Sequence, residues 1–267
     1  MRPIMTDELK QIELAILKNV ADFCDNHNLK YFLAYGTLIG AIRHKGFIPW
    51  DDDVDIWMPR DDYNKFINIY NDENDKYKLI SPSDTKSRHT FAKVEDTRTV
   101  KLENSIDYSN GCLGIDIDIF PLDGQPFDDE AFSRWYNKLI RQYKKFSYLI
   151  LERKGGSFKR RIFLPLIKIL VGKKEKILNK TTALHKKYPY ATSEYVGTVE
   201  SLYNFKSNRY KKEWFSDSVD VKFEDISFKA PIGYDDVLTA MYGDYMRLPP
   251  PEKRITHHSN NVFWLEG

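Results

Sequence analysis

The chain has 267 residues and a formal net charge of +2 at pH 7, which is long enough to bury a substantial core in one large domain or two small ones. Its two cysteines, Cys24 and Cys112, lie in apolar patterns, which argues against a disulfide framework or a zinc site and fits a reducing compartment. No apolar run reaches the roughly 20 residues of a membrane-spanning helix, and the first residues lack the apolar region of a secretory signal. We therefore expect a cytoplasmic protein.

The first 125 residues predict a mixed sheet with flanking helices. Apolar residues at helical spacing predict a helix from Thr6 to about Asn28, and Thr6 is a suitable N-cap residue. A short apolar strand at 31–35 is followed by a glycine turn and a short helix over 37–45. The other elements expected in this part are strands at 53–58, 77–80, 91–102 and 113–124, and a helix at 60–71.

Beyond residue 125 the pattern becomes mainly helical. The elements expected there are a long helix over 128–152, helical structure to about 190, short strands near 195–201 and 221–229, and a helix near 235–242. We therefore predict an α+β protein in two parts. Residues 1–125 form a part built on a mixed sheet, and residues 126–267 form a mainly helical part that ends in a C-terminal tail.

The small net charge conceals a strongly basic block. Residues 131–190 contain 17 Lys or Arg and two acidic residues, so this block carries +15 and the rest of the chain −13. Within it, residues 153–176 enclose an apolar run bracketed by cations, which is typical of a segment lying on an anionic membrane surface. A buried helix with cationic ends would give the same pattern. The block has no recognised nucleic-acid motif, so we expect no nucleic-acid partner.

The most informative stretch places four carboxylates within five residues. Residues 51–53 are all aspartate, and Asp55 follows. Acidic and β-branched residues alternate from residue 53 to residue 56, so Asp53 and Asp55 should point to one side of a strand, with Cα atoms about 6.6 Å apart. Like charges this close repel unless a cation lies between them, and a divalent ion is the usual solution. A solvated acidic turn is the alternative, but acids that continue into a half-buried strand favour a metal site.

A second strand also carries acids on one face. Asp116 and Asp118 alternate with isoleucines, so their carboxylates should face the same way. Three carboxylates from the two strands would suit Mg²⁺, which keeps open positions for substrate phosphates. One carboxylate can then accept the proton of an attacking hydroxyl. Gly36 and Thr37, at an earlier strand-to-helix turn, would offer N–H groups and a hydroxyl to a phosphate.

With these motifs, the chain resembles the LicD family, which includes bacterial phosphocholine transferases and is related to fukutin and fukutin-related protein. The resemblance covers most of the chain between residues 31 and 258, with the motifs in the family's order. The matching segments are Gly36 to Asp55, Phe91 to Val94 with Thr99, Ile117 to Gly124, and Tyr242 to Met246 with Pro249, Pro250 and Arg254 to His258. The first segment is long enough to be highly specific.

The resemblance implies a polymerase-β-like nucleotidyltransferase core. By that analogy Asp53, Asp55 and Asp118 are the catalytic residues and bind Mg²⁺ or Mn²⁺, and Asp118 is also the general base. Asp116 competes with Asp118, which is preferred because it directly precedes the Ile-Phe-Pro-Leu-Asp-Gly segment. Fifteen residues separate Thr37 from Asp53. This gap is longer than in many members of the superfamily, so the phosphate contact of the glycine-threonine turn is the less secure part of the analogy.

The resemblance also implies a reaction. A phospho-alcohol group, with phosphocholine as the first candidate, would pass from a CDP-activated donor such as CDP-choline to a sugar hydroxyl, with release of CMP. The acceptor would be a cell-surface glycan precursor or a lipid-linked glycan. That acceptor agrees with a protein that binds the inner face of the plasma membrane through its basic segment.

Residues in and near these motifs are candidates for substrate contacts. The set is Gly36, Thr37, Arg43, Trp50, Lys93, Arg254, His257 and His258. Arg43 and Lys93 would neutralise the leaving phosphate, and Trp50 would belong to an aromatic cage for a quaternary ammonium. The last three residues follow a run of prolines that directs the tail over the site. The alternative interpretations are an exposed helix face for the cations Arg43 and Lys93, a core aromatic residue for Trp50, and a tail that caps the protein without substrate contact for the last three residues.

Three other functions use parts of the same pattern. A nucleotidyltransferase that transfers NMP from an NTP would use the same three acids and release pyrophosphate. A glycosyltransferase would use an Asp-x-Asp motif for a nucleotide sugar, but such enzymes usually build a nucleotide-binding α/β unit first, and only one strand precedes Asp53. A non-catalytic binding module would tolerate Asp53→Asn and show no metal dependence.

Overall fold

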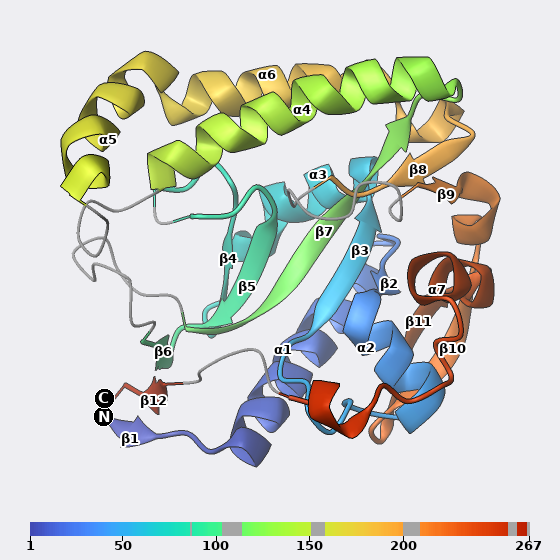
Figure 1. The fold of residues 1–267 in the computed structure, drawn as a ribbon. Coiled ribbons are helices and arrows are strands. Elements are labelled where there is room, and N and C mark those ends of the chain that lie inside the picture. Colours follow the sequence, from blue (N-terminus) through green and yellow to red (C-terminus); the bar gives the residue numbers. More distant parts are fainter. Residues whose placement is uncertain (86, 103–113, 151–157, 200–208, 256–260, 266–267) are drawn as a thin grey trace.

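A mixed sheet runs through the centre of the protein, and helices surround it in the computed structural model (Figure 1). The structure describes residues 1–85, 87–102, 114–150, 158–199, 209–255 and 261–265. Long helices and a mixed sheet together confirm the predicted α+β class.

The strands of the central sheet come from distant parts of the chain. They are β2 (Phe32–Leu33), β3 (Asp55–Pro59), β4 (Tyr77–Ile80), β5 (Ala92–Asp96), β7 (Ile115–Gln125), β8 (Tyr195–Gly197) and β9 (Tyr210–Lys211). The main path follows the order β2, β3, β7, β5, β4, and β8 pairs with the end of β7 and with β9. β3 and β7 are parallel, whereas the other neighbours are antiparallel. The long strand β7 is therefore the centre of the sheet.

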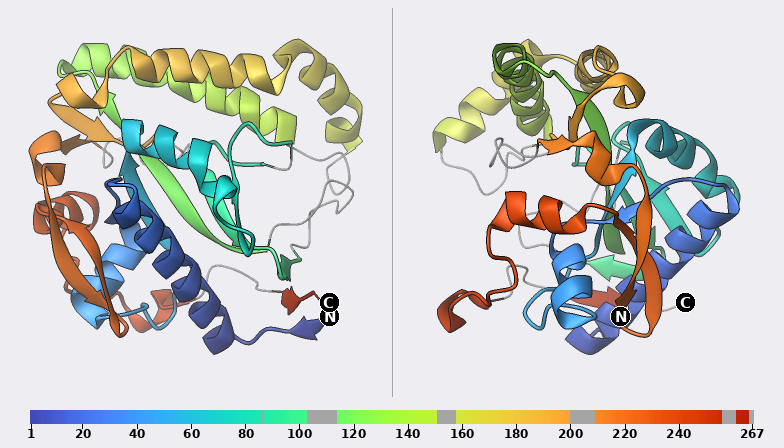
Figure 2. Two further views of the ribbon diagram at one scale, coloured as in Figure 1. Left: turned by 180° about the vertical axis from the view of Figure 1, so that it is seen from behind. Right: turned by 90° about the vertical axis from the view of Figure 1, so that its right-hand side faces the viewer.

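Helices surround this sheet and pack either on it or on one another. They are α1 (Thr6–Asn26), α2 (Tyr35–Ile39), α3 (Arg60–Ile69), α4 (Asp129–Ile150), α5 (Phe158–Val171), α6 (Lys174–Lys186) and α7 (Tyr234–Tyr242). In α1, Leu9, Ile16 and Val20 are buried at helical spacing, and the helix contacts β7 and β5. Figure 1 and Figure 2 show α4 and α6 side by side across one end of the sheet. Shorter helical turns are η1 (Gly40–His44), η2 (Tyr70–Asp72), η4 (Tyr190–Thr192), η6 (Lys212–Phe215) and η7 (Pro251–Lys253).

Two smaller sheets complete the fold. β10 (Ser218–Phe223) and β11 (Ile226–Pro231) form a hairpin that packs near β2. β12 (Val262–Trp264) lies between β1 (Arg2–Pro3) and β6 (Thr99–Lys101), so the two ends of the chain meet (Figure 1). The division into residues 1–125 and 126–267 stays a prediction. Among the described strands, three pairings join these parts, because β8 pairs with β7 and β12 pairs with both β6 and β1.

Two expected strands differ from those observed. The strand expected from residue 53 begins at Asp55, since its antiparallel neighbour β2 ends opposite Ile56. The single strand expected over 91–102 is two strands, β5 and β6, because the hydroxyl of Thr99 donates to the carbonyl of Asp96 at 2.8 Å and closes a turn between them. After this turn β6 leaves the central sheet and pairs with β12.

A buried ion cluster closes the far end of the β3–β7 pair. Nε and Nη2 of Arg60 donate to the two carboxylate oxygens of Asp123, each at 2.6 Å. Nδ1 of His185 lies 3.0 Å from Oδ2 of Asp123, and the hydroxyl of Tyr143 lies 3.3 Å from Nε2 of His185. Burial would raise the pKa of Asp123, but the charge of Arg60 and the contact with His185 outweigh it and hold the pKa well below its usual range. The cluster therefore ties α3, β7, α4 and α6 together.

Replacing Asp123 by alanine should lower the free energy of unfolding by about 3 kcal/mol, because the guanidinium of Arg60 then stays buried without its partner. Urea denaturation measures this loss. Asp220→Ala is the matched control, since it removes an exposed ion pair with Lys229 (2.8 Å) and should change stability by less than about 1 kcal/mol. Equal losses in the two variants would contradict the role of the cluster.

Acid should affect wild type and Asp123→Ala differently. The folded-state pKa of Asp123 is depressed, so its contribution is present above the unfolded-state pKa of about 3.9 and is lost as the pH falls through the folded-state value. Wild type should therefore lose more stability than the variant as the pH is lowered below about 4. Parallel denaturation curves over this range test the sign, and identical pH profiles would rule out the linkage.

Candidate functional site

The candidate site lies where β3 begins beside β7. In this parallel pair Asp55 is the register partner of Asp118, and the N–H of Asp118 donates to the carbonyl of Val54 at 2.9 Å. Neighbouring strands run about 4.8 Å apart, so the two aspartates are adjacent. The two acidic segments recognised in the sequence therefore meet, although 62 residues lie between Asp55 and Asp118.

Carboxylates crowd around Asp55. Its pKa is raised well above the ordinary value, first by burial and then by the negative charges of Asp53, Asp118 and Asp51. Burial and the charge of Asp53 raise the pKa of Asp51 to about 7. These four carboxylates therefore share one electrostatic environment, in which the charge of Lys93 offsets part of their mutual repulsion.

Thr37 and Gly36 lie directly against this cluster. The N–H of Asp55 donates to the hydroxyl of Thr37 at 2.9 Å, in a buried contact. A Cβ atom at Gly36 would lie 2.5 Å from Oδ2 of Asp51, so only glycine lets that carboxylate approach. Thr37 thus positions the start of β3, and a phosphate contact from either residue stays a prediction.

Lys93 joins the two acids of β7. It is the register partner of Asp118 on β5, and its ammonium donates to both Asp116 and Asp118. Burial would lower the pKa of Lys93, but the two carboxylates raise it. The ammonium is therefore held charged between them. Lys93 was expected near a leaving phosphate, and this contact with substrate stays a prediction.

The environments of Asp116 and Asp118 differ. The Asp116 side chain is 3% exposed and that of Asp118 is 23% exposed. Burial favours the neutral form of Asp116, but Lys93 and Lys101 outweigh it and lower its pKa to about 2. Burial instead raises the pKa of Asp118 to about 6, against the opposing charge of Lys93. This geometry favours Asp118 as the acid that substrate can reach, with Asp116 as the counter-ion of the lysines.

A second group of candidate residues comes together beside the acidic segment. The guanidinium carbon of Arg254 lies 5.5 Å from the ring centroid of Trp50. Arg43 donates to the carbonyl of Tyr245 at 2.5 Å, and its pKa is lowered by burial and by the charge of Arg254. Trp50 therefore already contacts a protein cation on its ring. His257 and His258 lie outside the described residues.

Sequence reasoning did not assign Asp51, Glu13 or Tyr242 to the site. The phenol of Tyr242 has a raised pKa through burial and through the charges of Asp55, Asp51 and Asp53, which places α7 beside the acids. Glu13 is buried in α1, and its pKa is raised by burial and by nearby acids, against the charge of Lys101. An acid on the apolar face of a helix was the available signal for Glu13. For Asp51 and Tyr242 the available signal was their place in segments that match the family, Gly36 to Asp55 and Tyr242 to Met246.

The donor set fits a divalent cation. Carboxylate oxygens are the ligands that Mg²⁺ and Mn²⁺ prefer, and the raised pKa values of Asp51 and Asp55 indicate a cluster that a cation would stabilise. Within the described ranges, no three His, Cys, Asp or Glu side chains are already converged on one metal position. Metal binding by Asp53, Asp55 and Asp118 stays a prediction.

Comparison with known proteins identifies the family. The family model described as LicD/FKTN/FKRP, nucleotidyltransferase domain, matches residues 28–175, which is more than half of the chain and includes both acidic segments. The chain belongs to the LicD family. This confirms the resemblance read from the motifs.

Individual members give the same result. The lipopolysaccharide cholinephosphotransferase LicD of Haemophilus influenzae is 34% identical over 272 residues, which cover 99% of this chain and 100% of that protein. An uncharacterized protein of Rickettsia typhi is 41% identical over 54 residues, and one of Rickettsia prowazekii is 43% identical over 47 residues. These shorter matches cover 20% and 18% of this chain and 18% of each relative. The similarity to LicD thus extends over the whole architecture.

Thr37→Val should expose the role of the threonine hydroxyl. The variant leaves the buried N–H of Asp55 without an acceptor, which costs about 1–3 kcal/mol of unfolding free energy. Hydrogen exchange at the Asp55 amide should become faster, because its protecting bond is lost. Thr37→Ser keeps the hydroxyl and should keep the amide protected. Equal exchange in both variants would show that this hydrogen bond does not hold the strand.

Proposed function

We propose that this protein is a metal-dependent transferase that moves phosphocholine from CDP-choline to a sugar hydroxyl of a cell-surface glycan precursor and releases CMP. The observation that carries the proposal is the parallel register that sets Asp55 beside Asp118, next to Asp53. The full-length similarity to a lipopolysaccharide cholinephosphotransferase supports phosphocholine as the transferred group and a lipopolysaccharide-type glycan as the acceptor.

The acids divide the work of such a reaction. Asp53, Asp55 and Asp118 would hold Mg²⁺, which when bound supplies neutralisation of the donor diphosphate. Asp118 accepts the proton of the attacking sugar hydroxyl, and its partial exposure lets the hydroxyl reach it. Lys93 orients this carboxylate through its hydrogen bond. The sugar oxygen forms its bond to the phosphorus that carries choline, and the bond from that phosphorus to the CMP oxygen breaks.

Two arginines suit the leaving phosphate. Arg43 and Arg254 are close enough for the charge of Arg254 to lower the pKa of Arg43, in addition to the effect of burial. Like charges at this separation are stabilised by an anion between them. Both guanidiniums donate to backbone carbonyls, of Tyr245 and Pro249, so their positions are held. They therefore form a candidate phosphate contact beside the acids, with Trp50 at its edge.

A nucleotidyltransferase is the second candidate function. The family model carries the description of a nucleotidyltransferase domain, and transfer of NMP from an NTP would use the same three acids. The two reactions differ in the phosphorus that is attacked and therefore in the product. Transfer from CDP-choline releases CMP, whereas transfer from CTP releases pyrophosphate.

Product analysis with a panel of donors tests the proposal. The protein is incubated with Mg²⁺, an acceptor glycan and CDP-choline, CDP-ribitol, CDP-glycerol or CTP, and CMP and pyrophosphate are quantified. We expect CMP from CDP-choline in preference to the other CDP-alcohols, and its loss after chelation of the metal. Release of pyrophosphate from CTP, with no CMP from any CDP-alcohol, would favour the second function instead.

Substitution of the acids should abolish turnover without unfolding the protein. Asp118→Ala removes the proposed base, so the rate of CMP release should fall by about 10²–10⁴-fold, and Asp53→Ala should cost at least as much. Circular dichroism checks the fold. Asp220→Ala, on the distant hairpin, is the control and should keep the wild-type rate. Near-normal rates for Asp53→Ala or Asp118→Ala would overturn the assignment.

We also propose that α5 holds the enzyme on an anionic membrane at the cytoplasmic face. Four large apolar side chains of α5 are exposed, namely Phe163 (55%), Leu166 (56%), Ile169 (76%) and Leu170 (85%). Exposed apolar area of this kind, next to Lys168 and Lys173, suits an interfacial helix. No helix in the described part of the chain has the length and apolar character needed to cross a bilayer. Of the expected segment 153–176, residues 153–157 lie outside the described residues.

Charged substitutions on α5 should release the protein from vesicles. The double variant Ile169→Glu with Leu170→Glu removes two exposed apolar side chains and adds negative charge, so co-sedimentation with vesicles that contain phosphatidylserine should fall at least about tenfold. Met5→Glu changes an equally exposed apolar residue elsewhere and should bind as wild type does. Unchanged sedimentation of the double variant would refute this surface.

A further inference from the structure

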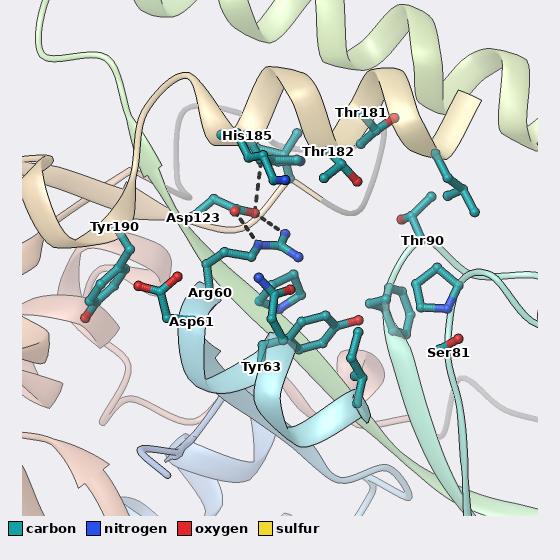
Figure 3. A pocket seen from close by; sticks show the side chains of 18 of the residues that line it. Arg60, Asp61, Tyr63, Ser81, Thr90, Asp123, Thr181, Thr182, His185 and Tyr190 are labelled. Carbon is teal, nitrogen blue, oxygen red and sulfur yellow. Dashed lines mark hydrogen bonds and ion pairs between the residues drawn. The ribbon is translucent and has the colours of Figure 1, made fainter. Parts of the chain in front are cut away.

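A cavity lies at the end of the β3–β7 pair that is opposite the catalytic acids. Its volume is about 380 Å³, within the range of small-ligand pockets. α3, α6 and the segment before β5 surround it, with Arg60 and Asp123 at its deep end (Figure 3). Arg60 follows Asp55 by five residues along β3, which places this end about 16 Å from the acids. The cavity is therefore separate from the candidate metal site.

The charges that line this cavity compensate one another. Asp123 uses both carboxylate oxygens on Arg60, and Asp61 and Lys186 add one charge of each sign. His185 contacts the same carboxylate. An anionic ligand such as a phosphate would have to compete with Asp123 for Arg60, so the lining does not favour a charged ligand.

Protein cations already lie over three of the aromatic rings in the lining. The guanidinium carbon of Arg60 is 5.1 Å from the ring centroid of Tyr63. The Nζ atoms of Lys93 and Lys187 lie 5.7 Å and 5.5 Å from the rings of Phe91 and Tyr188, respectively. A cationic head group such as choline would be repelled by these charges. The cavity therefore favours a neutral ligand.

Neutral hydrogen-bonding groups line the opposite walls. They are the hydroxyls and amides of Asn64, Ser81, Ser83, Thr90, Asn179 and Thr182. Figure 3 shows Thr182 on the α6 side of the space and Tyr63 on the α3 side. A sugar ring matches such a lining, because its hydroxyls both donate and accept hydrogen bonds while its C–H faces pack on aromatic rings.

We propose that this cavity binds a neutral sugar unit of the acceptor glycan, a unit other than the one that receives phosphocholine. The identification of the sugar as part of the acceptor rests on the proposed function. Phe91 connects the two places, because it lines the cavity and its ring lies beside Lys93, which is bonded to Asp118. A glycan seated in the cavity can extend over Phe91 towards the general base. By binding this sugar unit, the cavity determines which glycan serves as the acceptor.

Binding of neutral saccharides to the whole protein tests this proposal. Saturation-transfer NMR is recorded with methyl glycosides of common hexoses and with lactose as probes, in the absence of metal and CDP-choline. Because neither is present, the measurement succeeds or fails independently of the transfer reaction. We expect binding to wild type, and at least about tenfold weaker binding when Asn64→Leu and Thr182→Val are combined, since two hydrogen-bonding groups are lost.

Two further variants sharpen the test. Thr182→Phe fills the cavity from an exposed helix position and should abolish saccharide binding while circular dichroism shows an intact fold. Thr239→Val changes a similarly exposed threonine on α7 and should bind as wild type does. The proposal fails if no neutral saccharide binds wild type, or if binding is unchanged in both cavity variants. It also fails if choline or CMP binds wild type and loses this binding in Thr182→Phe, whereas no sugar behaves in this way.

Discussion

The parallel register between β3 and β7 is the constraint on which the site depends. Side chains alternate between the two faces of a strand, so a shift of one residue would move Asp118 to the other face of the sheet. At this point the N–H of Asp118 donates to the carbonyl of Val54 across the two strands, and the N–H of Asp55 donates to the hydroxyl of Thr37, which fixes the start of β3 on α2. The acidic pair therefore depends on backbone contacts and not on attraction between its own side chains, which repel each other.

That repulsion explains the surrounding structure. Buried carboxylates are costly unless cations compensate them, and β5 supplies Lys93 to the two acids of β7. On the β3 side, burial and the charges of neighbouring aspartates raise the pKa of Asp51 and Asp55, and the opposing charge of Lys93 on Asp55 is the weaker effect. The asymmetry divides the acids into a compensated group and a group suited to an incoming cation. This division suits the proposed phosphotransfer, in which a metal would bind together with the substrate phosphates.

The two ends of the β3–β7 pair have different chemistry. One end gathers the crowded acids of both strands, whereas the other holds Asp123 in a closed cluster with Arg60 and His185. The closed cluster stabilises the contact of α6 with the sheet and leaves the adjoining cavity without net charge. A single rigid strand pair thus carries both the proposed reaction centre and the proposed sugar site, with Phe91 between them. Such an arrangement would hold the acceptor at a constant distance from the base.

Local patterns in the sequence determined the α+β class, the long first helix, the alternation of acids with apolar residues, and the family to which the chain belongs. Strand ends were less accurate, since Asp55 and not residue 53 begins β3. The pairing partners of each strand decide where a ladder starts, and those partners lie far away in the sequence. Domain boundaries are subject to the same limit, because β12 returns from the end of the chain to pair with β6.

Only the tertiary structure decided how far Asp116 and Asp118 differ in exposure, directed the Thr37 hydroxyl to the Asp55 N–H, and assembled the cavity beneath α6. Periodicity tells which residues share a face of one strand. It does not tell which lysine will reach that face, how much of each carboxylate will stay exposed, or which helix will cover the strand's other end. These properties arise between segments that only the folded chain brings together.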